Sequence, residues 1–449
     1  MGLIEKRGFR AVLATAMVAA FAFLALLISP AAFAESGDVA VPNSDDGGTL
    51  TIAKTDQDQN PLAGVVFKAC PILKDSKAAD LTDSATWADF NAFDGNVKEG
   101  LQDKGYTVSE DCLTTDATDA KGEATLEHLS GAYLLVETTK PANVADATVP
   151  FIITMPFPNY NDGKTVTAWS WNVTATPKNV VAGTPTKTTD DSQAHVAGDT
   201  ITWDITVPVP DTTVKTFKVV DNFDSKLESP ALVKVTVGGV DKTSEFTASA
   251  VDNELTVTAN DPASLKGQTV VVTVSAKVKD AGAIPNTAEV FVNDSHQKVT
   301  TEGESKWGEI NVLKFKKGDE TAVLAGAKFD LYLAKDETSN ELGVKLLGDL
   351  TTNDKGTLDK DLVVKAGRYC FVETQAPEGY VLDKTPKCTN VAERTPTTGV
   401  AVVKVPNTQV VGPHLPKTGA NGTILLTVAG LAVLLMAGGT AVVSKRRNR

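Results

Sequence analysis

Apolar residues occupy every second position in several short stretches of the chain, such as residues 201–207, 270–274 and 288–292. In the first of these stretches, Ile201, Trp203 and Ile205 alternate with threonine and aspartate. Because successive side chains of a β-strand point to opposite faces, this pattern predicts strands with one buried face. Short strands with turn residues between them are typical of a β-sandwich, which we predict for residues 183–305.

Three sequence blocks occur twice, in the same order, on either side of that stretch. They are residues 50–54, 62–67 and 133–138 in the first copy and residues 310–314, 324–329 and 369–374 in the second. The repetition predicts two copies of one domain type. The predicted domains, called below the first, middle and third segments, are residues 48–182, 183–305 and 307–410. Short linkers are expected at residues 183–186 and 303–305.

The composition of the chain favours one fold class throughout. Threonine and valine are frequent and patterns of helical period are scarce, so we expect an all-β protein made of tandem immunoglobulin-like β-sandwich domains. Residues 75–111 are the exception. They fit strands poorly and are expected to form an insertion in the first segment that contains a helix.

The N-terminus has the pattern of an export signal. Lys6, Arg7 and Arg10 precede an apolar run over residues 11–28, and Ala-Phe-Ala follows at residues 32–34. Positive charge, an apolar core and a small-x-small cleavage site are typical of a secretory signal peptide, which we predict at residues 1–34. An uncleaved membrane anchor is the alternative.

The C-terminus combines three features. The pentapeptide consists of Leu415, Pro416, Lys417, Thr418 and Gly419. An apolar run at residues 423–443 follows it and is just long enough to span a bilayer. The basic residues 445–449 end the chain and should stay in the cytoplasm. Without the pentapeptide, a permanent membrane anchor would be the simplest interpretation.

Charge and histidine placement exclude several classes of function. The net charge is −13, which argues against nucleic acid as a partner and is ordinary for a solvated surface. The histidines are scattered, at positions 128, 195, 296 and 414, and none has the spacing of a metal ligand or stands near a plausible nucleophile. We therefore expect no metal site, no cofactor and no enzymatic activity.

The four cysteines divide between the two repeated segments. Cys70 and Cys112 lie in the first segment, and Cys370 and Cys388 lie in the third. Export permits disulfides, and we expect the two local pairs Cys70–Cys112 and Cys370–Cys388. The sequence alone allows three connectivities, and free thiols are the further alternative.

Strand parity places ionisable and amide side chains on faces that are otherwise apolar. They are Lys54, Glu137, Asp221, Asn286, Lys314, Glu373 and Asn407. A buried lysine tends to lose its proton and become a nucleophile, and a buried carboxylic acid tends to stay neutral. Such an acid can polarise an asparagine carbonyl and transfer a proton while ammonia leaves, which would give a Lys–Asn isopeptide bond. The alternative is a lysine that extends to solvent or pairs with an acid.

The pentapeptide, apolar run and basic tail resemble the cell-wall sorting signal of Gram-positive surface proteins, over residues 415–449. The resemblance implies that a sortase cysteine attacks the bond between Thr418 and Gly419 and holds Thr418 as a thioester. The apolar helix would then be a retention device that is absent from the finished protein.

The first and third segments resemble the collagen-adhesin B-type fold, through the first-strand lysine, the block Tyr-x-x-Val-Glu-Thr and a terminal Pro-Asn or Pro-Lys-Asn. The middle segment resembles the isopeptide-forming middle domain of backbone pilins at residues 185–188, 198–203 and 285–288. The resemblance implies three intramolecular bonds, each with a promoting acid: Lys54–Asn179 with Glu137, Lys187–Asn286 with Asp221, and Lys314–Asn407 with Glu373.

The end of the first segment resembles the pilin motif W-x-x-x-V-x-V-x-P-K-N. It matches at Trp169, Val173, Pro177, Lys178 and Asn179, and departs from the usual residues at positions 175–176. Strand parity turns Asn179 inward and Lys178 outward. The resemblance implies that Lys178 attacks the sortase thioester of another subunit and forms a Lys178–Thr418 bond. Such head-to-tail contacts do not close, so they build a filament.

Nearly the whole chain resembles an LPXTG-anchored major, or backbone, pilin of Gram-positive bacteria. The implied location is an extracellular, cell wall-anchored pilus that supports adhesion. The implied partners are a pilin-polymerising sortase, a housekeeping sortase, other copies of the chain, minor pilins and peptidoglycan; the sequence identifies no adhesion ligand. The alternatives are a wall-anchored adhesin that does not polymerise, a minor pilin at the tip or base, and a membrane-retained receptor.

Overall fold

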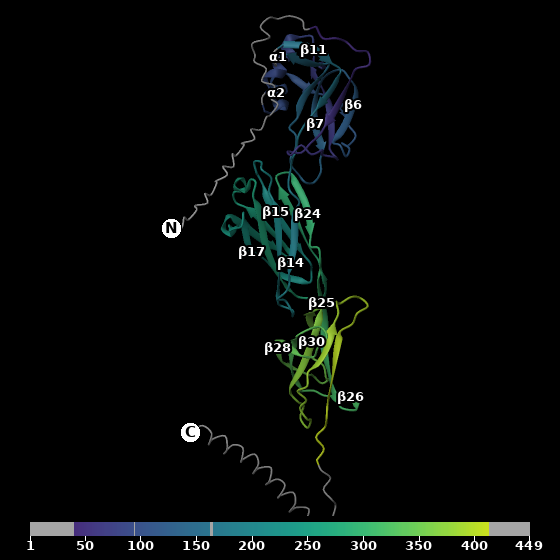
Figure 1. The fold of residues 1–449 in the computed structure, drawn as a ribbon, viewed down its shortest axis with the longest axis vertical. Helices are drawn as coiled ribbons and strands as arrows, with labels where there is room; N and C mark the ends of the chain where they lie inside the picture. The colour runs from purple at the N-terminus through teal and green to yellow at the C-terminus, as the bar shows by residue number, and fades with distance from the viewer. Residues whose placement is uncertain (1–39, 94, 162–164, 413–449) are drawn as a thin grey trace, which may run out of the picture. The chain divides into compact units, whose positions relative to one another are not determined.

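The computed structural model describes residues 40–93, 95–161 and 165–412. The predicted signal peptide at residues 1–34 and the predicted sorting signal at residues 415–449 lie outside these ranges. Within the described ranges, no helix is both long and apolar enough to cross a membrane. The chain divides into two compact units, one up to Trp307 and one from Gly308 onward. Figure 1 shows the strand-rich character of the chain.

The first segment packs two main sheets against each other. One has the order β12-β1-β6, from Asn172–Ala175, Gly48–Ala53 and Glu123–Leu129. The other contains β3 (Lys77–Ala78), β2 (Val66–Lys74), β7 (Gly131–Thr139) and β9 (Phe151–Met155), with β4 (Tyr106–Val108) and β5 (Leu113–Thr114) paired to β2. Leu50 and Ile52 of β1 pack on Phe67 and Leu135 of the second sheet, which makes this layer the core.

Two small ribbons complete the first segment. They are β10 (Phe157–Asn161) with β11 (Thr165–Ser170), and β8 (Val144–Asp146) with β13 (Val180–Val181). The β1 strand runs parallel to β12, with Leu50 opposite Val173. The first and last long strands of the segment therefore lie side by side.

Two short helices lie within residues 75–111, which confirms the predicted helical insertion. They are α1 (Ser84–Ala92) and α2 (Val97–Asp103). Asp83 accepts a hydrogen bond from the Ala85 N–H at the start of α1, and Asn96 accepts one from the Glu99 N–H at the start of α2. Beneath them lies a second apolar cluster that includes Trp87, Leu101 and Tyr106.

The middle segment is a sandwich of two five-stranded sheets. One has the order β14-β15-β21-β17-β18, from Thr186–Asp190, Thr200–Pro208, Thr269–Val278, Leu227–Val237 and Val240–Asp241. The other has the order β19-β20-β16-β23-β24, from Phe246–Val251, Glu254–Ala259, Phe217–Phe223, Asn286–Val292 and Ser295–Thr300. Short 3₁₀ helices occur at Thr243–Glu245 and Pro262–Leu265. The predicted alternation is confirmed, since Ile201, Trp203, Ile205 and Val207 are all buried.

Polar contacts join the first and middle segments within the first unit. The Asp146 carboxylate accepts hydrogen bonds from the Thr212 hydroxyl at 2.8 Å and from the Asn293 amide at 3.1 Å. Lys140 forms an ion pair with Asp294 at 2.6 Å. Because Asp146 lies on β8, the middle segment contacts the ribbon that borders the end of the first segment.

The third segment is built around β25 (Ser305–Lys316). This strand pairs with β22 (Gly282–Ile284), β26 (Asp319–Val323), β29 (Leu362–Lys365) and β32 (Ala401–Asn407). The second sheet has the order β28-β27-β30-β31, from Leu342–Thr351, Lys328–Ala334, Gly367–Gln375 and Lys387–Val391. The strands β25 and β32 run parallel, as β1 and β12 do in the first segment, with Lys314 opposite Val405. β25 begins at Ser305, inside the expected linker, because Ser305 pairs with Ile284 and is buried.

All four cysteines form disulfides. Cys70 of β2 is joined to Cys112, and Cys370 of β30 is joined to Cys388 of the neighbouring β31. In both repeated segments the disulfide includes a strand of the sheet opposite the first strand. Each disulfide shortens the loops available to the unfolded chain and so stabilises the folded sandwich.

One glycine in each repeated segment closes a turn against the first strand. The carbonyl of Gly356 accepts the Lys314 N–H at 2.7 Å, and that of Gly122 accepts the Lys54 N–H at 2.8 Å. Gly356 has φ +70°, and a Cβ there would lie 2.5 Å from the Lys314 carbonyl oxygen. Only glycine fits this position, because both the backbone conformation and the space exclude a side chain.

The Gly356→Ala variant should lose unfolding free energy on the order of 3 kcal/mol, because it adds a clash with the Lys314 backbone to the strain of a positive φ. Gly318→Ala is the matched control, since Gly318 has φ +91° but open space around its Cβ. The control should lose about 1–2 kcal/mol from strain alone. Calorimetry of the mature chain measures both, and equal losses would refute the role of the Gly356 contact.

Candidate functional site

The third segment brings Lys314, Glu373 and Asn407 into one buried cluster. Lys314 Nζ lies 2.9 Å from Glu373 Oε1 and also donates to Asn407 Oδ1. The Asn407 Nδ2 group donates to Glu373 Oε1 at 2.9 Å and to Oε2 at 3.1 Å. All three residues are at most 1% exposed. The carboxylate thus contacts both the amine and the amide nitrogen.

The sandwich positions these three side chains. Lys314 and Asn407 lie near the ends of the adjacent parallel strands β25 and β32, and Glu373 comes from β30 in the opposite sheet. The ring of Phe329 lies 5.8 Å from the Lys314 amine and forms an apolar wall. Burial lowers the pKa of Lys314, against the opposing effect of Glu373. The Asp383 N–H donates to Glu373 Oε2 at 2.9 Å and fixes the carboxylate.

The first segment holds an equivalent cluster. Lys54 Nζ donates to Asn179 Oδ1 at 2.6 Å and lies 3.1 Å from Glu137 Oε2. The Asn179 Nδ2 group donates to Glu137 Oε1 at 2.7 Å. The Phe67 ring lies 5.5 Å from the amine, in the place that Phe329 takes in the third segment. Burial lowers the pKa of Lys54 to about 8, although Glu137 acts in the opposite direction.

The middle segment arranges its three residues differently. Lys187 of β14 donates to both oxygens of Asp221 on β16, at 2.8 and 2.7 Å. Asn286, at the start of β23, donates to Asp221 Oδ2 at 3.4 Å, while its own buried Oδ1 has no hydrogen-bond partner in the described part of the chain. Burial lowers the pKa of Lys187 to about 8 and raises the pKa of Asp221. The lysine and the asparagine therefore meet at a shared carboxyl group.

This arrangement fits one kind of chemistry. A lysine with a lowered pKa readily supplies a neutral amine, which is the nucleophilic form. In the first and third segments the amine contacts the carboxamide that it would attack, and the acid contacts the nitrogen that would leave. The acid can therefore carry a proton from the amine to the leaving nitrogen.

The neighbouring residues Lys178 and Asn179 have opposite environments. Asn179 is 1% exposed, whereas the Lys178 side chain is exposed. A parallel bridge joins Lys178 to Thr55, next to Lys54, and the Asn179 N–H donates to the Thr55 carbonyl at 3.0 Å. The backbone that carries the exposed amine is therefore held against the buried cluster. The predicted acceptor of Lys178, Thr418, lies outside the described residues.

Several residues that support these clusters were not predicted from the sequence. The phenylalanines over the amines belong to the repeated blocks, so the repeat itself could have indicated them. The backbone N–H of Asp383 carries no sequence signal, because every residue type except proline can supply it. Thr148 contacts the first cluster from a loop with no strand pattern, and only the structure identifies it.

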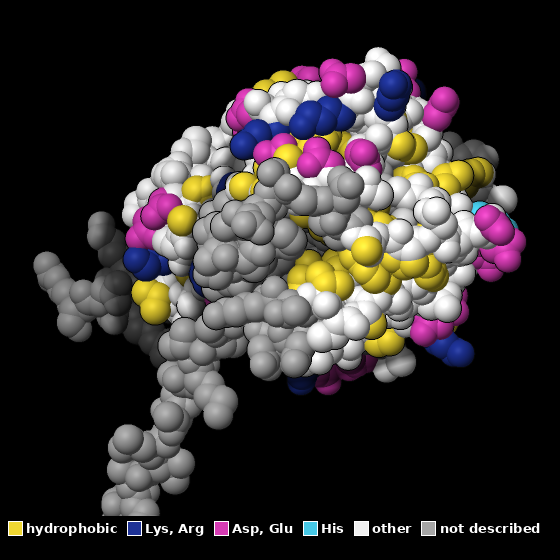
Figure 2. All heavy atoms as spheres, turned by 90° about the horizontal axis from the view of Figure 1, so that it is seen from above, with side chains coloured by type: hydrophobic (Ala, Val, Ile, Leu, Met, Phe, Trp, Pro, Cys, Tyr) yellow, Lys and Arg dark blue, Asp and Glu magenta, His cyan; other side chains and the backbone are white. Residues whose placement is uncertain are grey.

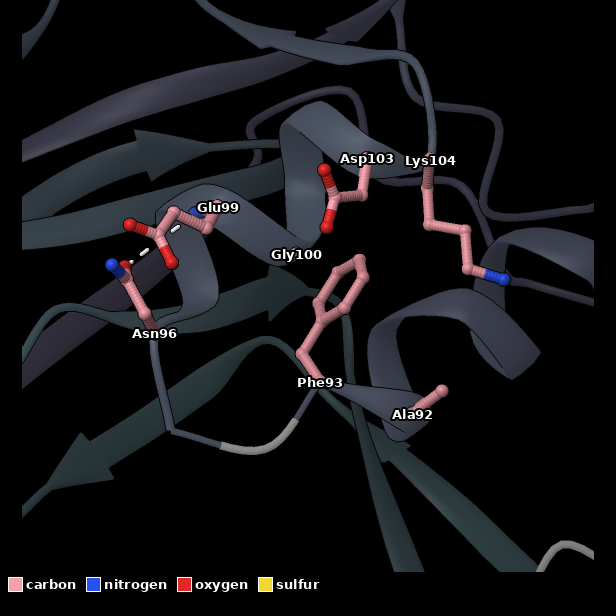
Figure 3. Close-up of a pocket in the computed structure, with 7 residues that line it drawn as sticks. All are labelled: Ala92, Phe93, Asn96, Glu99, Gly100, Asp103 and Lys104. Carbon is pink, nitrogen blue, oxygen red and sulfur yellow. Dashed lines mark hydrogen bonds between the residues drawn. The ribbon is translucent and has the colours of Figure 1, made fainter.

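One surface hollow is lined by none of the residues of the three clusters. It is lined by Ala92, Phe93, Asn96, Glu99, Gly100, Asp103 and Lys104, at the ends of α1 and α2, and Phe93 points toward Gly100 (Figure 3). Within the described ranges, no group of three His, Cys, Asp or Glu side chains could hold a metal ion. On the face seen in Figure 2, basic, acidic and hydrophobic side chains are interspersed, without a large patch of one charge.

Three family models match successive parts of the chain. The Gram-positive pilin subunit D1 N-terminal domain matches residues 32–180, the SpaA prealbumin-like fold domain matches residues 311–405, and the LPXTG cell wall anchor motif matches residues 407–449. The last match covers the pentapeptide and the apolar run that lie outside the described residues.

Similar proteins and structures agree with these matches. Fimbrial subunit type 2 of Actinomyces naeslundii is 29% identical over 94% of each chain, and fimbrial subunit type 1 of Actinomyces viscosus is 29% identical over 82% of each. The full-length major pilin SpaD of Corynebacterium diphtheriae has the same fold, with a TM-score of 0.66 and 24% identity over 83% of this chain and all of that one. Together, the three family matches, the fimbrial relatives and the shared fold support a sortase-assembled major pilin, which is a structural subunit of a pilus shaft anchored to the cell wall.

Proposed function

We propose that a pilin-polymerising sortase joins these subunits through a bond between Thr418 of one copy and Lys178 of the next. The observation that carries the proposal is the position of Lys178, which is exposed beside a buried, hydrogen-bonded asparagine. The match to the LPXTG anchor motif over residues 407–449, which include Thr418, supports the donor side of this bond. One donor and one acceptor on each copy give a head-to-tail polymer.

The same proposal assigns the end of assembly to a second enzyme. A housekeeping sortase would attack the Thr418–Gly419 bond and transfer Thr418 to peptidoglycan, which anchors the finished fibre. Minor pilins would share the fibre, and the polymer would present adhesive surfaces away from the cell. The chain itself would have no enzymatic turnover.

Within each subunit, we propose that the three clusters close into isopeptide bonds. The lysine Nζ forms a bond to the asparagine Cγ, the bond from Cγ to Nδ2 breaks, and the proton of the amine passes through the acid to the departing nitrogen. The products are a secondary amide and ammonia. The predicted pairs are Lys54–Asn179, Lys187–Asn286 and Lys314–Asn407.

These bonds would give the shaft its mechanical strength. In the first and third segments they would join the first strand to the chain end that runs parallel to it. A crosslink that closes a loop of about 100 residues stabilises the folded state by about 4–5 kcal/mol on the chain-entropy estimate for disulfides. The first, middle and third segments would then be three separately locked domains.

The polymerisation proposal predicts the behaviour of wall extracts on a denaturing gel. Cells that make the wild-type protein should give a ladder of boiling-resistant high-mass species, because the subunits are joined by covalent bonds. Lys178→Ala should leave only the monomer, since it removes the attacking amine.

Lys121→Ala is the matched control for this gel, because Lys121 is another exposed lysine of the first segment. The control should keep the ladder. A ladder that persists in Lys178→Ala would move the acceptor to a different lysine. The absence of a ladder in the wild type would favour an adhesin that is anchored to the wall as a single chain.

An Asn286→Ala variant cannot form the proposed bond to Lys187, so the lysine keeps its ionisable amine. The unfolding free energy of this variant should therefore depend on pH in a way that reveals the buried amine of Lys187. Lys187 has a pKa of about 8 in the folded state against its usual 10.5. Between these two values the unfolded state binds more protons than the folded state, so stability should rise with pH across this window.

The double variant Lys187→Met with Asn286→Ala is the control for this measurement, because it lacks the titrating amine. Thermal unfolding of both variants across the alkaline range makes the comparison. The single variant should gain stability relative to the control as pH rises above 8. Parallel curves would contradict the assignment of a buried, ionisable Lys187.

A further inference from the structure

Thr148 contacts both the amine and the carboxamide oxygen of the first-segment cluster. Its backbone N–H donates to Asn179 Oδ1 at 2.7 Å. Its hydroxyl oxygen accepts from Lys54 Nζ and lies 3.1 Å from Asn179 Oδ1. The hydroxyl also donates to the carbonyl of Lys178 at 2.8 Å. Thr148 thus adjoins both the amine and the oxygen of the carboxamide that the amine would attack.

The local fold explains this position. Thr148 follows β8, and β8 pairs with β13, which begins directly after Asn179. The register places Asp146 opposite Val180, so the chain two residues later lies beside the asparagine side chain. The contact between Thr148 and Asn179 therefore depends on the pairing of β8 with β13.

The other two clusters lack an equivalent donor among the described residues. The Oδ1 atom of Asn286 has no hydrogen-bond partner, and the Oδ1 atom of Asn407 receives its hydrogen bond from Lys314. In the third segment the supporting backbone donor, Asp383, contacts the acid instead. The first cluster is therefore distinguished by a donor aimed at the carboxamide oxygen.

We propose that Thr148 is a catalytic residue for the first-segment bond, an inference that rests on the proposed Lys54–Asn179 reaction. When the Lys54 amine adds to the Asn179 Cγ, negative charge develops on Oδ1. A preorganised N–H at hydrogen-bond distance from that oxygen stabilises the charge, as in an oxyanion hole. When the bond from Cγ to Nδ2 breaks and ammonia leaves, Oδ1 becomes the carbonyl oxygen of the new amide.

The hydroxyl of Thr148 has a separate part in the same step. Its single hydrogen can go to the Lys178 carbonyl at 2.8 Å or to Asn179 Oδ1 at 3.1 Å, and in either case its lone pairs remain free to accept a hydrogen from the amine. Lys54 Nζ donates to Thr148 Oγ1 and to Asn179 Oδ1 and lies 3.1 Å from Glu137 Oε2. Once the amine has given a proton to Glu137, its hydrogen bond to Thr148 would hold it beside the Asn179 carboxamide. Thr148 therefore orients the nucleophile as well as stabilising the product of its attack.

The test follows bond formation in growing cells that secrete the full chain. Newly made protein is labelled with an isotopic pulse, and the tryptic peptide that joins Lys54 to Asn179 is quantified by mass spectrometry at successive chase times. Thr148→Val removes the hydroxyl with little change of shape and should slow the bond about tenfold. Thr148→Ser keeps both groups and should react at the wild-type rate.

Thr148→Pro removes the backbone donor and should slow the bond by about 10²–10³-fold. Formation of the Cys70–Cys112 disulfide shows whether the Thr148→Pro variant has folded. If it has not, the comparison of Thr148→Val with Thr148→Ser tests the proposal. The Lys314–Asn407 peptide is the internal control and should form at an unchanged rate in every variant.

The outcomes separate this inference from the proposed bond. Equal rates in wild type, Ser and Val would overturn the role of the hydroxyl, and a folded Pro variant at the wild-type rate would overturn the role of the amide. A wild-type chain without any Lys54–Asn179 peptide would instead refute the first-segment bond itself, and the role of Thr148 with it.

Discussion

The burial of a lysine amine in the core of each sandwich is the constraint on which the rest of this structure depends. Lys54, Lys187 and Lys314 are at most 3% exposed, and each has a carboxyl group within 3.1 Å. A buried ion pair contributes little stability, because the loss of hydration offsets the attraction between the charges. Conversion of amine and carboxamide into a neutral amide would remove the charge and leave a covalent crosslink. The buried lysine, acid and asparagine therefore contribute little stability as an ion pair, but they are well placed for a single irreversible reaction.

The fold provides what that reaction needs. In the first segment the parallel pairing of β1 with β12, continued by the bridge from Thr55 to Lys178, sets the amine beside the carboxamide. The parallel pairing of β25 with β32 does the same in the third segment, and in both segments the facing sheet supplies the acid. The apolar wall around the amine lowers its pKa, and the same wall keeps water from the site. The β-sandwich is therefore the scaffold that brings these residues together, and it is also the structure that the proposed crosslink would strengthen.

Much of this arrangement could be predicted from the sequence, for a physical reason. Strand parity has a period of two, so Lys54 and Glu373 could be assigned to apolar faces from their neighbours alone. The outward Lys178 and inward Asn179 followed from the same rule. Contacts made by the backbone or by loops carry no such period. For that reason the sequence did not reveal Thr148, the Asp383 N–H, or the strand pairing that extends β25 to Ser305.

The intact mass of the mature chain tests the central claim most directly, because each Lys–Asn bond removes one molecule of ammonia. Mass spectrometry of the secreted, disulfide-reduced chain should give the sequence mass less three ammonia molecules. The variant with alanine at Asn179, Asn286 and Asn407 should give its full sequence mass. A wild-type chain at its full sequence mass would contradict the account, since the buried lysines would then be ordinary ion pairs.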